Sequence, residues 1–297
     1  MAGRGMTLKV DVDTLRGTRE GVPRLARLFK RLGLPATFLF SLGPDHTGRA
    51  IRRVFRPGFL GKVRRTSVAS HYGIRTLLYG TLLPGPDIGK LCRGEMLRVA
   101  EAGFEVGVHA YDHVKWQDAV ANATLGWTRE QLGLAVARFE KIFGFSPLIH
   151  GAAGWQVNEY VPALERQFGI EIASDTRGRA PFLPVGGALQ VPTTLPTLDE
   201  VLGLQCAGVE DSVHRICELS LAGNGGHHVF TLHAELEGGA FIAPFESLLR
   251  TWMDAGFEFR TLGGVARAFD RSPVDRGRIE FGEIEGRSGT LAVQAPR

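Results

Sequence analysis

Four residues in two short motifs have the types and spacing that bind a divalent metal ion: Asp11 and Asp13 in one, His109 and His113 in the other. Alternation along a strand would point both aspartates to the same side, where their charges crowd unless a cation or a shared proton intervenes. In a helical turn, the i, i+4 spacing would set both imidazoles on one side. The alternatives are a surface turn for the aspartates and an accidental pair for the histidines.

Asp13, His109 and His113 together would supply one oxygen and two nitrogen ligands. Such a set leaves a coordination position open for water, which is typical of catalytic metal sites. Zinc, cobalt, manganese or iron would each accept these ligands.

A third histidine, His233, ends an apolar segment and is a candidate general acid or base. Imidazole titrates near neutral pH and can pass a proton to an amine leaving group. A buried core histidine is the alternative. Asp175 closes another apolar segment, where it could hold an imidazole by a hydrogen bond, and Glu235 and Asp112 are close enough in sequence to support the same sites.

The elements that must position these residues alternate between strands and helices. Residues 8–13 alternate like a strand, and residues 22–32 repeat apolar side chains with helical spacing between Pro23 and Gly33. Further strands are predicted at residues 36–40, 104–108, 148–149, 170–174, 229–232 and 257–260, and further helices at 95–102, 132–143, 159–168, 213–221 and 245–255. This order predicts parallel strands joined by helical crossovers, in a barrel or a doubly wound sheet, with the chemistry at the carboxyl ends of the strands.

Composition excludes several classes of protein. The 297 residues carry a formal charge of +4, with 44% hydrophobic and 22% charged residues, which fits a globular chain and not a disordered or collagen-like one. Three cysteines without CxxC spacing indicate neither a disulfide framework nor a thiolate zinc site. Residues 1–6 are too short for a signal peptide, and no run of 18 apolar residues occurs, so we expect a cytosolic protein that does not cross a membrane.

Two segments interrupt the alternation. Residues 46–86 contain no acidic residue but many aromatic and leucine side chains, together with basic residues that include Arg52, Arg53, Arg56, Lys62, Arg64 and Arg65. This mixture favours an insertion that lies on an anionic membrane surface. A solvated basic insertion is the alternative, and nucleic-acid binding is disfavoured because no recognition motif is present. Residues 271–297, rich in Gly, Arg and Glu, are expected to form a C-terminal tail after a single domain of residues 1–270.

The chain resembles the polysaccharide deacetylase superfamily, the NodB-like enzymes of carbohydrate esterase family four. Within it the chain is most similar to the branch of 4-deoxy-4-formamido-L-arabinose-phosphoundecaprenol deformylases. The resemblance extends from residue 8 to beyond residue 260. The motifs that carry it are VDVDT at 10–14, RGTREGVP at 16–23, HAYDH at 109–113 with Trp116 and Gln117, AAGW at 152–155, SDTRG at 174–178, PTTLPT at 192–197 and TLHAE at 231–235.

The resemblance implies an α/β fold, a distorted (β/α)7-type barrel with one divalent metal ion, commonly zinc. It implies that Asp11 is the base that takes a proton from the attacking water, and that Asp13, His109 and His113 hold the metal. His233 would then protonate the departing amine.

The remaining implied roles concern positioning. Asp175 would orient His233 and raise its pKa, and a backbone N–H near Gly154 or Trp155 would bind the oxyanion. The superfamily orients its base with an arginine in the third motif, which residues 151–155 lack. Arg177 or Arg16 is our candidate for its replacement.

The implied reaction removes the formyl group from undecaprenyl-phosphate 4-deoxy-4-formamido-L-arabinose, giving formate and the free aminosugar lipid. This step belongs to the lipid A modification that reduces binding of polymyxin-like peptides. Because the substrate has a lipid tail, we expect the protein to act at the cytoplasmic side of the inner membrane. The basic insertion would bind the phosphate that links the sugar to the lipid. A deacetylase of another N-acylated sugar and a non-catalytic sugar-lipid binding protein are the alternatives.

Overall fold

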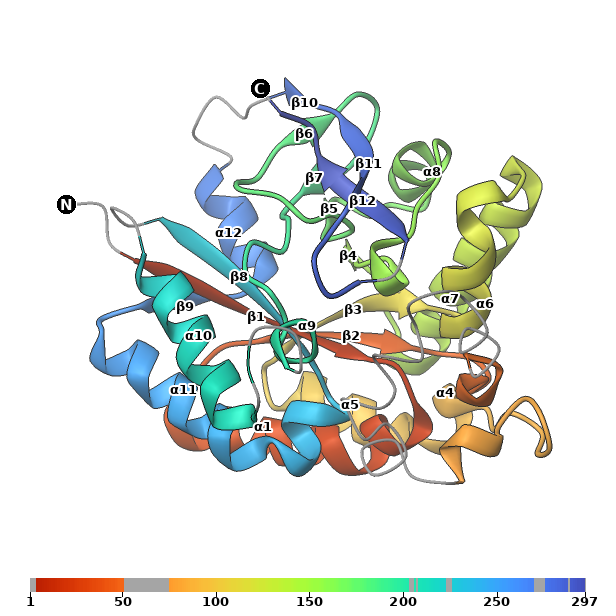
Figure 1. The fold of residues 1–297 in the computed structure, drawn as a ribbon. Coiled ribbons are helices and arrows are strands. Elements are labelled where there is room, and N and C mark those ends of the chain that lie inside the picture. Colours follow the sequence, from red (N-terminus) through yellow and green to blue (C-terminus); the bar gives the residue numbers. More distant parts are fainter. Residues whose placement is uncertain are drawn as a thin grey trace.

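A curled, mostly parallel sheet forms the centre of the molecule (Figure 1). The computed structural model describes residues 4–50, 75–202, 206, 208–222, 226–269, 276–287 and 289–296. Seven strands follow one another in the order β7-β5-β4-β3-β2-β1-β8, all paired in parallel, and β9 pairs with the first residues of β1. Their bounds are β1 Gly5–Val12, β2 Thr37–Ser41, β3 Glu105–Ala110, β4 Ile149–His150, β5 Ile172–Ala173, β7 Leu189–Gln190, β8 His227–His233 and β9 Glu258–Arg260.

The two ends of this sheet meet through a less regular contact. Thr194, just after β7, donates its N–H to the carbonyl of Val229 in β8 at 3.1 Å, and the hydroxyls of Thr193 and Thr231 are 2.7 Å apart. The sheet therefore curls into a distorted barrel. This is one of the two arrangements that the alternation of elements predicts and the one that the resemblance implies, so the prediction of the fold is confirmed.

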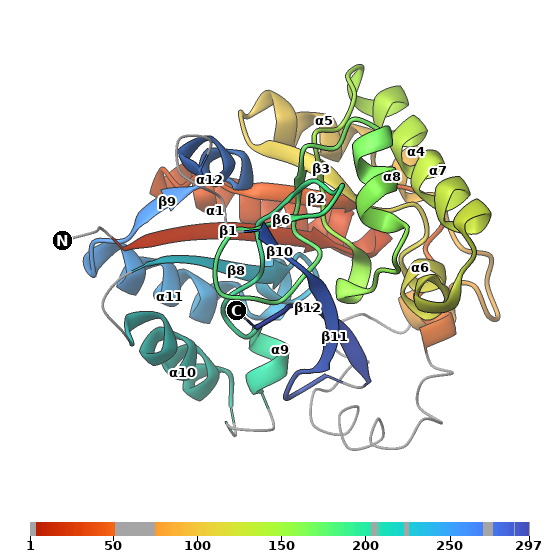
Figure 2. The same cartoon turned by 90° about the horizontal axis from the view of Figure 1, so that it is seen from above.

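Helices follow most strands and cover the outside of the barrel (Figures 1 and 2). The α-helices are α1 Val22–Leu32, α4 Ile88–Leu91, α5 Arg93–Glu101, α6 His113–Ala119, α7 Leu125–Phe143, α8 Val161–Gln167, α9 Leu198–Val201, α10 Val209–Leu221, α11 Ile242–Asp254 and α12 Leu262–Phe269. None of the helices in the described part of the chain is long and apolar enough to span a bilayer.

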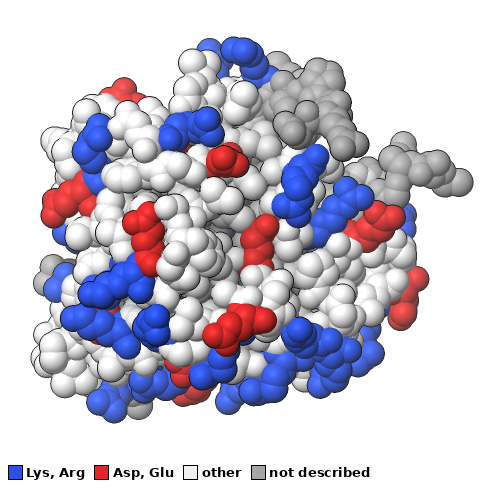
Figure 3. Space-filling model, turned by 180° about the vertical axis from the view of Figure 1, so that it is seen from behind, with Lys and Arg blue, Asp and Glu red and all other residues white. Residues whose placement is uncertain are grey.

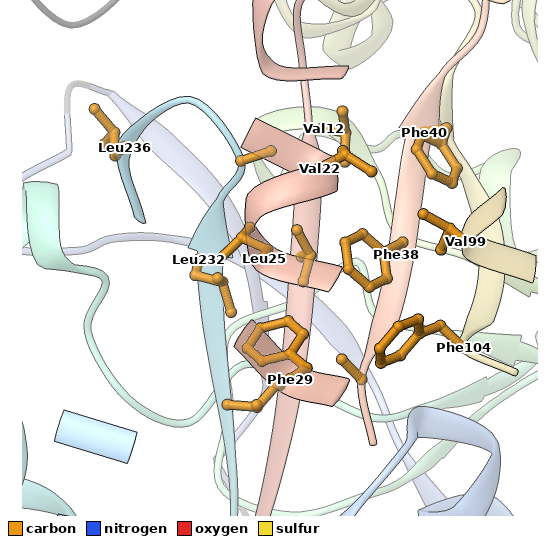
Figure 4. Packing of buried hydrophobic residues seen from close by; sticks show 14 of the residues in the cluster. Val12, Val22, Leu25, Phe29, Phe38, Phe40, Val99, Phe104, Leu232 and Leu236 are labelled. Atoms are coloured by element: carbon orange, nitrogen blue, oxygen red, sulfur yellow. The ribbon is translucent and has the colours of Figure 1, made fainter. Parts of the chain in front are cut away.

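The helix α1 illustrates how the sequence sets these elements. Pro23 lies in its first turn, where a missing N–H costs nothing, and Gly33 ends it in the left-handed conformation with a φ of 69°. Its apolar stripe, which includes Leu25 and Phe29, packs on β1 and β2 in the main core (Figure 4). Phe38 and Phe104 extend the same core.

Strand β1 is buried along its whole length, but its two faces differ. Leu8, Val10 and Val12 join the apolar core beneath the helices. The alternate residues Lys9 and Asp11 are also buried, although both are charged. Because successive side chains point to opposite faces of a strand, this pattern places charged groups inside the barrel.

The C-terminal segment differs from the expected tail. Residues Ile279–Glu283 form β11 and Thr290–Gln294 form β12, an antiparallel pair, while β10 (Arg276–Gly277) pairs with β6 (Leu183–Pro184). Ala292 of β12 is completely buried in a core cluster. The sequence pattern misses this hairpin because its apolar residues contact remote parts of the chain and show little local periodicity.

Candidate active site

The three residues predicted to bind a metal lie together at the carboxyl ends of β1 and β3. Nε2 of His109 is 3.2 Å from Oδ1 of Asp13, and Nε2 of His113 is 3.5 Å from the same oxygen. One ligand atom from each residue lies within 4.8 Å of the others. This is the spacing that allows three side chains to share one ion.

The two histidines reach this position by a different route from the helical turn that the spacing suggested. His109 lies in β3, and His113 is the first residue of α6. Between them Asp112 caps α6, because its carboxylate accepts the N–H of Lys115 at 3.1 Å. The rings are 5.3 Å apart and inclined by 30°, so the strand-to-helix turn places them on one side.

The tautomer of His109 suits a metal ligand. Its Nδ1 is 2.6 Å from the carbonyl oxygen of Gly151, which can only accept, so Nδ1 carries the proton and donates it. The lone pair of Nε2 is then directed at Asp13. Oδ1 of Asp13 is buried without a hydrogen-bond partner among the described residues. A lone pair and a carboxylate oxygen facing each other in a buried site require a cation between them, so these residues fit a divalent metal ion.

The electrostatics of Asp13 agree with this fit. Burial alone would raise its pKa, but the charge of His113 lowers the pKa well below the usual value, so Asp13 is ionised. Glu235 supports the segment that carries it, since its carboxylate accepts the N–H of Asp13 at 3.1 Å and the N–H of Thr14 at 2.8 Å. Burial and the charge of Asp13 raise the pKa of Glu235 to about 8.

Asp11, the expected base, has Lys9 as its positive partner. The Nζ atom of Lys9 lies 3.4 Å from Oδ2 of Asp11 and donates to the carbonyl of Ser174 at 3.1 Å. The lysine side chain is completely buried. Alternation places residues 9, 11 and 13 on one side of the strand, so the same rule that pairs the aspartates could have identified Lys9.

Arg177 and Arg16, the arginines expected to orient Asp11, have other partners. Nη1 of Arg177 donates to both carboxylate oxygens of Glu200, at 2.7 and 2.9 Å, and Nη2 donates to the carbonyl of Leu195 at 3.0 Å. Arg16 pairs with Glu20 at the surface. The prediction of an arginine beside Asp11 is therefore wrong for Arg177, because the buried Glu200 binds its guanidinium.

Gly151 provides the space that Lys9 occupies. A Cβ atom at this position would lie 3.2 Å from Cε of Lys9 and would overlap a methyl group of Leu39. Glycine at position 151 therefore leaves room for the aliphatic part of the Lys9 side chain.

His233 lies at the end of β8, opposite Asp11 in the register of the sheet. Its Nδ1 is 3.8 Å from Oδ1 of Asp199, and its backbone N–H donates to Glu237 at 2.8 Å. Burial would lower the pKa of His233, but the charges of Asp199, Asp13 and Glu237 raise it. The acid beside His233 is thus Asp199.

The prediction that Asp175 orients His233 is wrong, because Asp175 belongs to a separate buried cluster. Its Oδ1 is 3.2 Å from Nδ1 of His150, which is also 2.6 Å from Oε1 of Glu165. Burial would lower the pKa of His150, but Asp175 and Glu165 raise it to about 10. Asp175 also accepts the N–H of Ala152 at 2.7 Å, so this cluster holds the start of the 152–155 loop.

The predicted oxyanion loop is present but only part of it is available. The N–H of Trp155 donates to the carbonyl of Ala152 at 3.0 Å, so of the two expected donors Gly154 is the better candidate. Both residues have positive φ, 63° at Gly154 and 53° at Trp155, and Trp155 pays a conformational cost there that glycine does not. Strain of this kind is frequent in functional loops.

The indole of Trp155 is surrounded by three cations from distant parts of the chain. Lys9 lies 5.3 Å from a ring centroid, Arg177 lies 5.1 Å away and Arg287 lies 4.8 Å away. Each distance is within the range of a cation–π interaction. Sequence reasoning missed Asp199 and Arg287, which only the fold brings to the site. It also missed His150 and Glu165, the partners of Asp175 in the separate buried cluster.

The structure describes the basic insertion at its two ends, residues 46–50 and 75–86. Arg52, Arg53, Arg56, Lys62, Arg64 and Arg65 lie outside the described residues. At the first end of the insertion, His46 contacts Asp112 at 2.6 Å. This contact joins the insertion to the cap of α6, one residue before His113.

Comparison with known proteins identifies relatives over nearly the whole chain. No family model matches. A protein of Shewanella sediminis is 36% identical over 97% of this chain and 94% of its own, and a protein of Wigglesworthia glossinidia brevipalpis is 32% identical over 94% and 98%. Both are named as the 4-deoxy-4-formamido-L-arabinose-phosphoundecaprenol deformylase ArnD.

Solved structures share the fold at low sequence identity. A Mycobacterium smegmatis protein named as a polysaccharide deacetylase superposes with a TM-score of 0.63 at 17% identity, covering 94% of this chain and 96% of its own. The allantoinase Puue superposes with a TM-score of 0.62 at 14% identity, covering 91% of each chain. These similarities show that the chain shares its fold with these proteins.

Proposed function

Because this chain belongs to the family of 4-deoxy-4-formamido-L-arabinose-phosphoundecaprenol deformylases, we propose that it hydrolyses the formamide of that sugar lipid to formate and a free amine. The observation that carries the proposal is the convergence of Asp13, His109 and His113, with Asp11 and His233 at the ends of the adjacent strands β1 and β8. A ligand set, a base and an acid are the groups that amide hydrolysis requires.

Asp13, His109 and His113 would hold the divalent metal ion. When bound, such an ion polarises an amide carbonyl and makes water more acidic. Zinc is the metal we favour, and manganese or cobalt fits the same oxygen and nitrogen donors. The hydrogen bond from His109 to Gly151 keeps its Nε2 oriented for this purpose.

Asp11 serves as the base. It takes a proton from the water that attacks the formyl carbon, and Lys9 keeps its carboxylate in place. Of the two carboxylates in this motif, Asp13 faces the histidines more closely, so the two have separate roles.

His233 serves as the acid. It donates a proton to the sugar nitrogen as the C–N bond breaks, so that formate and a neutral amine leave the site. Asp199 beside its Nδ1 favours the protonated imidazole, which is the form that can donate. The N–H of Gly154 stabilises the oxyanion that forms on the formyl oxygen.

The substrate of the named relatives contains phosphoundecaprenol, a lipid that stays in a bilayer. We propose that the protein works as a peripheral protein on the cytoplasmic surface of the inner membrane. The basic residues of the 46–86 insertion would bind its anionic lipids or the phosphate of the substrate. Nucleic acid is not an expected partner, because the sequence contains no recognition motif. On the face drawn in Figure 3, acidic and uncharged areas lie between groups of Lys and Arg side chains.

The test is release of formate from the formamido sugar lipid by the metal-loaded protein, with the N-acetyl sugar lipid as a matched control substrate. We expect formate from the first and little acetate from the second. Acetate without formate would instead indicate a deacetylase, and release of neither by a protein that binds the lipid would indicate a binding protein.

A further inference from the structure

The C-terminal hairpin places the side chain of Arg287 at the active site. This residue lies in the turn between β11 and β12. Its Nε donates to Oε1 of Glu200 at 2.7 Å, and its guanidinium lies 3.5 Å from Oδ1 of Asp199. It also stacks on the indole of Trp155 at 4.8 Å. A residue ten positions from the C-terminus thus contacts both sides of the site.

The oxygen that Arg287 contacts is the one that faces the proposed acid. Oδ1 of Asp199 is 3.8 Å from Nδ1 of His233, and Thr197 donates its hydroxyl to the same oxygen at 2.6 Å. Arg287 also donates to the hydroxyl oxygen of Thr197 at 3.3 Å. Asp199 is therefore fixed from two directions while it faces the histidine.

The hairpin is anchored firmly enough to position a side chain. Strand β12 exchanges two backbone hydrogen bonds with Arg177, since the N–H of Arg177 donates to Ala292 at 2.9 Å and the N–H of Gln294 donates to Arg177 at 2.7 Å. Gln156, next to Trp155, donates to the carbonyl of Thr290 at 2.7 Å. These bonds join the hairpin to the oxyanion loop and to the segment after β5 (Figures 1 and 2).

A bidentate or stacked arginine holds carboxylates in one geometry better than a lysine does, because its donors form a rigid planar fork. Here the fork joins two consecutive carboxylates of α9, Asp199 and Glu200. Glu200 keeps a second partner in Arg177, so helix α9 does not depend on Arg287 alone. Asp199 is held by Arg287 together with the hydroxyl of Thr197.

We propose that Arg287 is a positioning residue of the active site, through which the C-terminal hairpin holds Asp199 against His233. The hairpin is then a part of the catalytic apparatus and not an appendage of the barrel. The kinetic part of this inference rests on the proposed deformylase function, whereas the positioning of Asp199 can be measured without it.

The experiment compares four variants of the full chain with the wild type: Arg287→Ala, Arg287→Lys, Asp199→Asn and Arg287→Ala combined with Asp199→Asn. Arg278→Ala is the matched control, because Arg278 lies at the base of the same hairpin and pairs with Glu280 at the surface. We expect Arg287→Ala to lower kcat by about 10- to 100-fold with KM and metal content nearly unchanged. Arg287→Lys should recover part of the loss, and Arg278→Ala should behave as the wild type.

The double variant decides whether Arg287 acts through Asp199. If it does, the combined change lowers kcat no further than Asp199→Asn alone. Losses that multiply, or a kcat of Arg287→Ala within twofold of the wild type, would overturn the proposal. If Arg287→Ala does not fold, Arg287→Lys takes its place. Its kcat, alone and combined with Asp199→Asn, then tests whether Arg287 acts through Asp199.

Hydrogen exchange gives a readout that is independent of the reaction. The amides of Glu200 and Val201 both donate to the carbonyl of Thr197 in the turn that carries Asp199. We expect them to exchange faster in Arg287→Ala than in the wild type, and at the wild-type rate in Arg278→Ala. Equal exchange in all three proteins contradicts the positioning role. If Arg287→Ala exchanges faster but the wild-type protein releases no formate, only the proposed function is contradicted.

Discussion

Lys9 and Asp11 form a buried ion pair inside the barrel, with Nζ and Oδ2 3.4 Å apart. Neither side chain is accessible to solvent to a useful extent, so removal of one leaves the other charge uncompensated. The pair connects the stability of the barrel to the orientation of the proposed base.

The first prediction concerns this pair. Lys9→Met should destabilise the protein by about 3 kcal/mol and lower kcat by at least tenfold, because Asp11 loses its cation. Lys9→Arg should retain more of both, and metal content should stay unchanged because Lys9 contacts none of the proposed ligands. Denaturant unfolding, steady-state kinetics and metal analysis measure these effects. A Lys9→Met protein with full turnover would remove Lys9 from the mechanism.

The second prediction separates the proposed base, Asp11, from the proposed metal ligands. Asp11→Asn should bind metal as the wild type does but lose turnover by about 100-fold or more, whereas His109→Ala should lose both. Metal analysis after dialysis, with circular dichroism as a control for folding, distinguishes them. Equal loss of metal in the two variants would reverse the assignment of base and ligand.

The third prediction concerns metal and stability. An ion that binds only the folded chain raises the free energy of unfolding by about 2.7 kcal/mol at a concentration 100 times Kd. Adding zinc, manganese or cobalt to chelator-treated protein should therefore raise Tm, and His113→Ala should abolish most of the increase. Thermal unfolding with and without metal is the measurement. An equal rise in the variant would place the ion elsewhere.

The fourth prediction follows from the buried cluster of His150, Glu165 and Asp175. The pKa of His150 is raised to about 10 in the folded chain, against about 6.5 when unfolded, so folding favours its charged form. Its stabilising contribution is complete below about pH 6.5 and is lost as the pH rises towards 10.

His150→Gln should consequently be less stable than the wild type by about 3 kcal/mol at pH 6, and this difference should shrink by pH 10. Chemical denaturation at a series of pH values measures it. The raised pKa of Glu165 acts in the same direction over this range, because burial and Asp175 favour its protonated form. A difference that does not change with pH would mean that His150 is neutral in the folded protein.

The fifth prediction concerns the membrane. Replacing Arg52, Arg53, Arg56, Lys62, Arg64 and Arg65 with glutamine should release the protein from vesicles that contain anionic lipid, since each cation contributes about 1 kcal/mol near such a surface. Sedimentation with anionic and neutral vesicles, together with turnover of a soluble short-chain substrate, separates binding from catalysis. Continued sedimentation of the variant would assign the membrane contact to another surface.

Local pattern was sufficient to predict the elements that form the site's framework. The helix at residues 22–32 has the predicted bounds, because its apolar spacing, Pro23 and Gly33 are all local signals. The strand ends that carry Asp13, His109 and His233 could also be predicted, since parallel strands place their carboxyl ends at one edge. These signals need no knowledge of distant contacts.

The partners of these residues could not be predicted in the same way. Asp199 replaces Asp175 beside His233, and Lys9 replaces the expected arginine beside Asp11. The pairing of Asp199 with His233 joins residues that are far apart in the chain, so it depends on the curvature of the sheet and on how the loops pack. Only Lys9 had a local signal, two residues before Asp11 on the same face of β1.

The absence of a side chain at position 151 has a consequence for mutagenesis of the loop. A Cβ atom there would overlap the methyl group of Leu39 and press on the stem of Lys9. An alanine scan of residues 151–155 therefore reports at its first position on the packing of two strands, and only at the later positions on the loop itself.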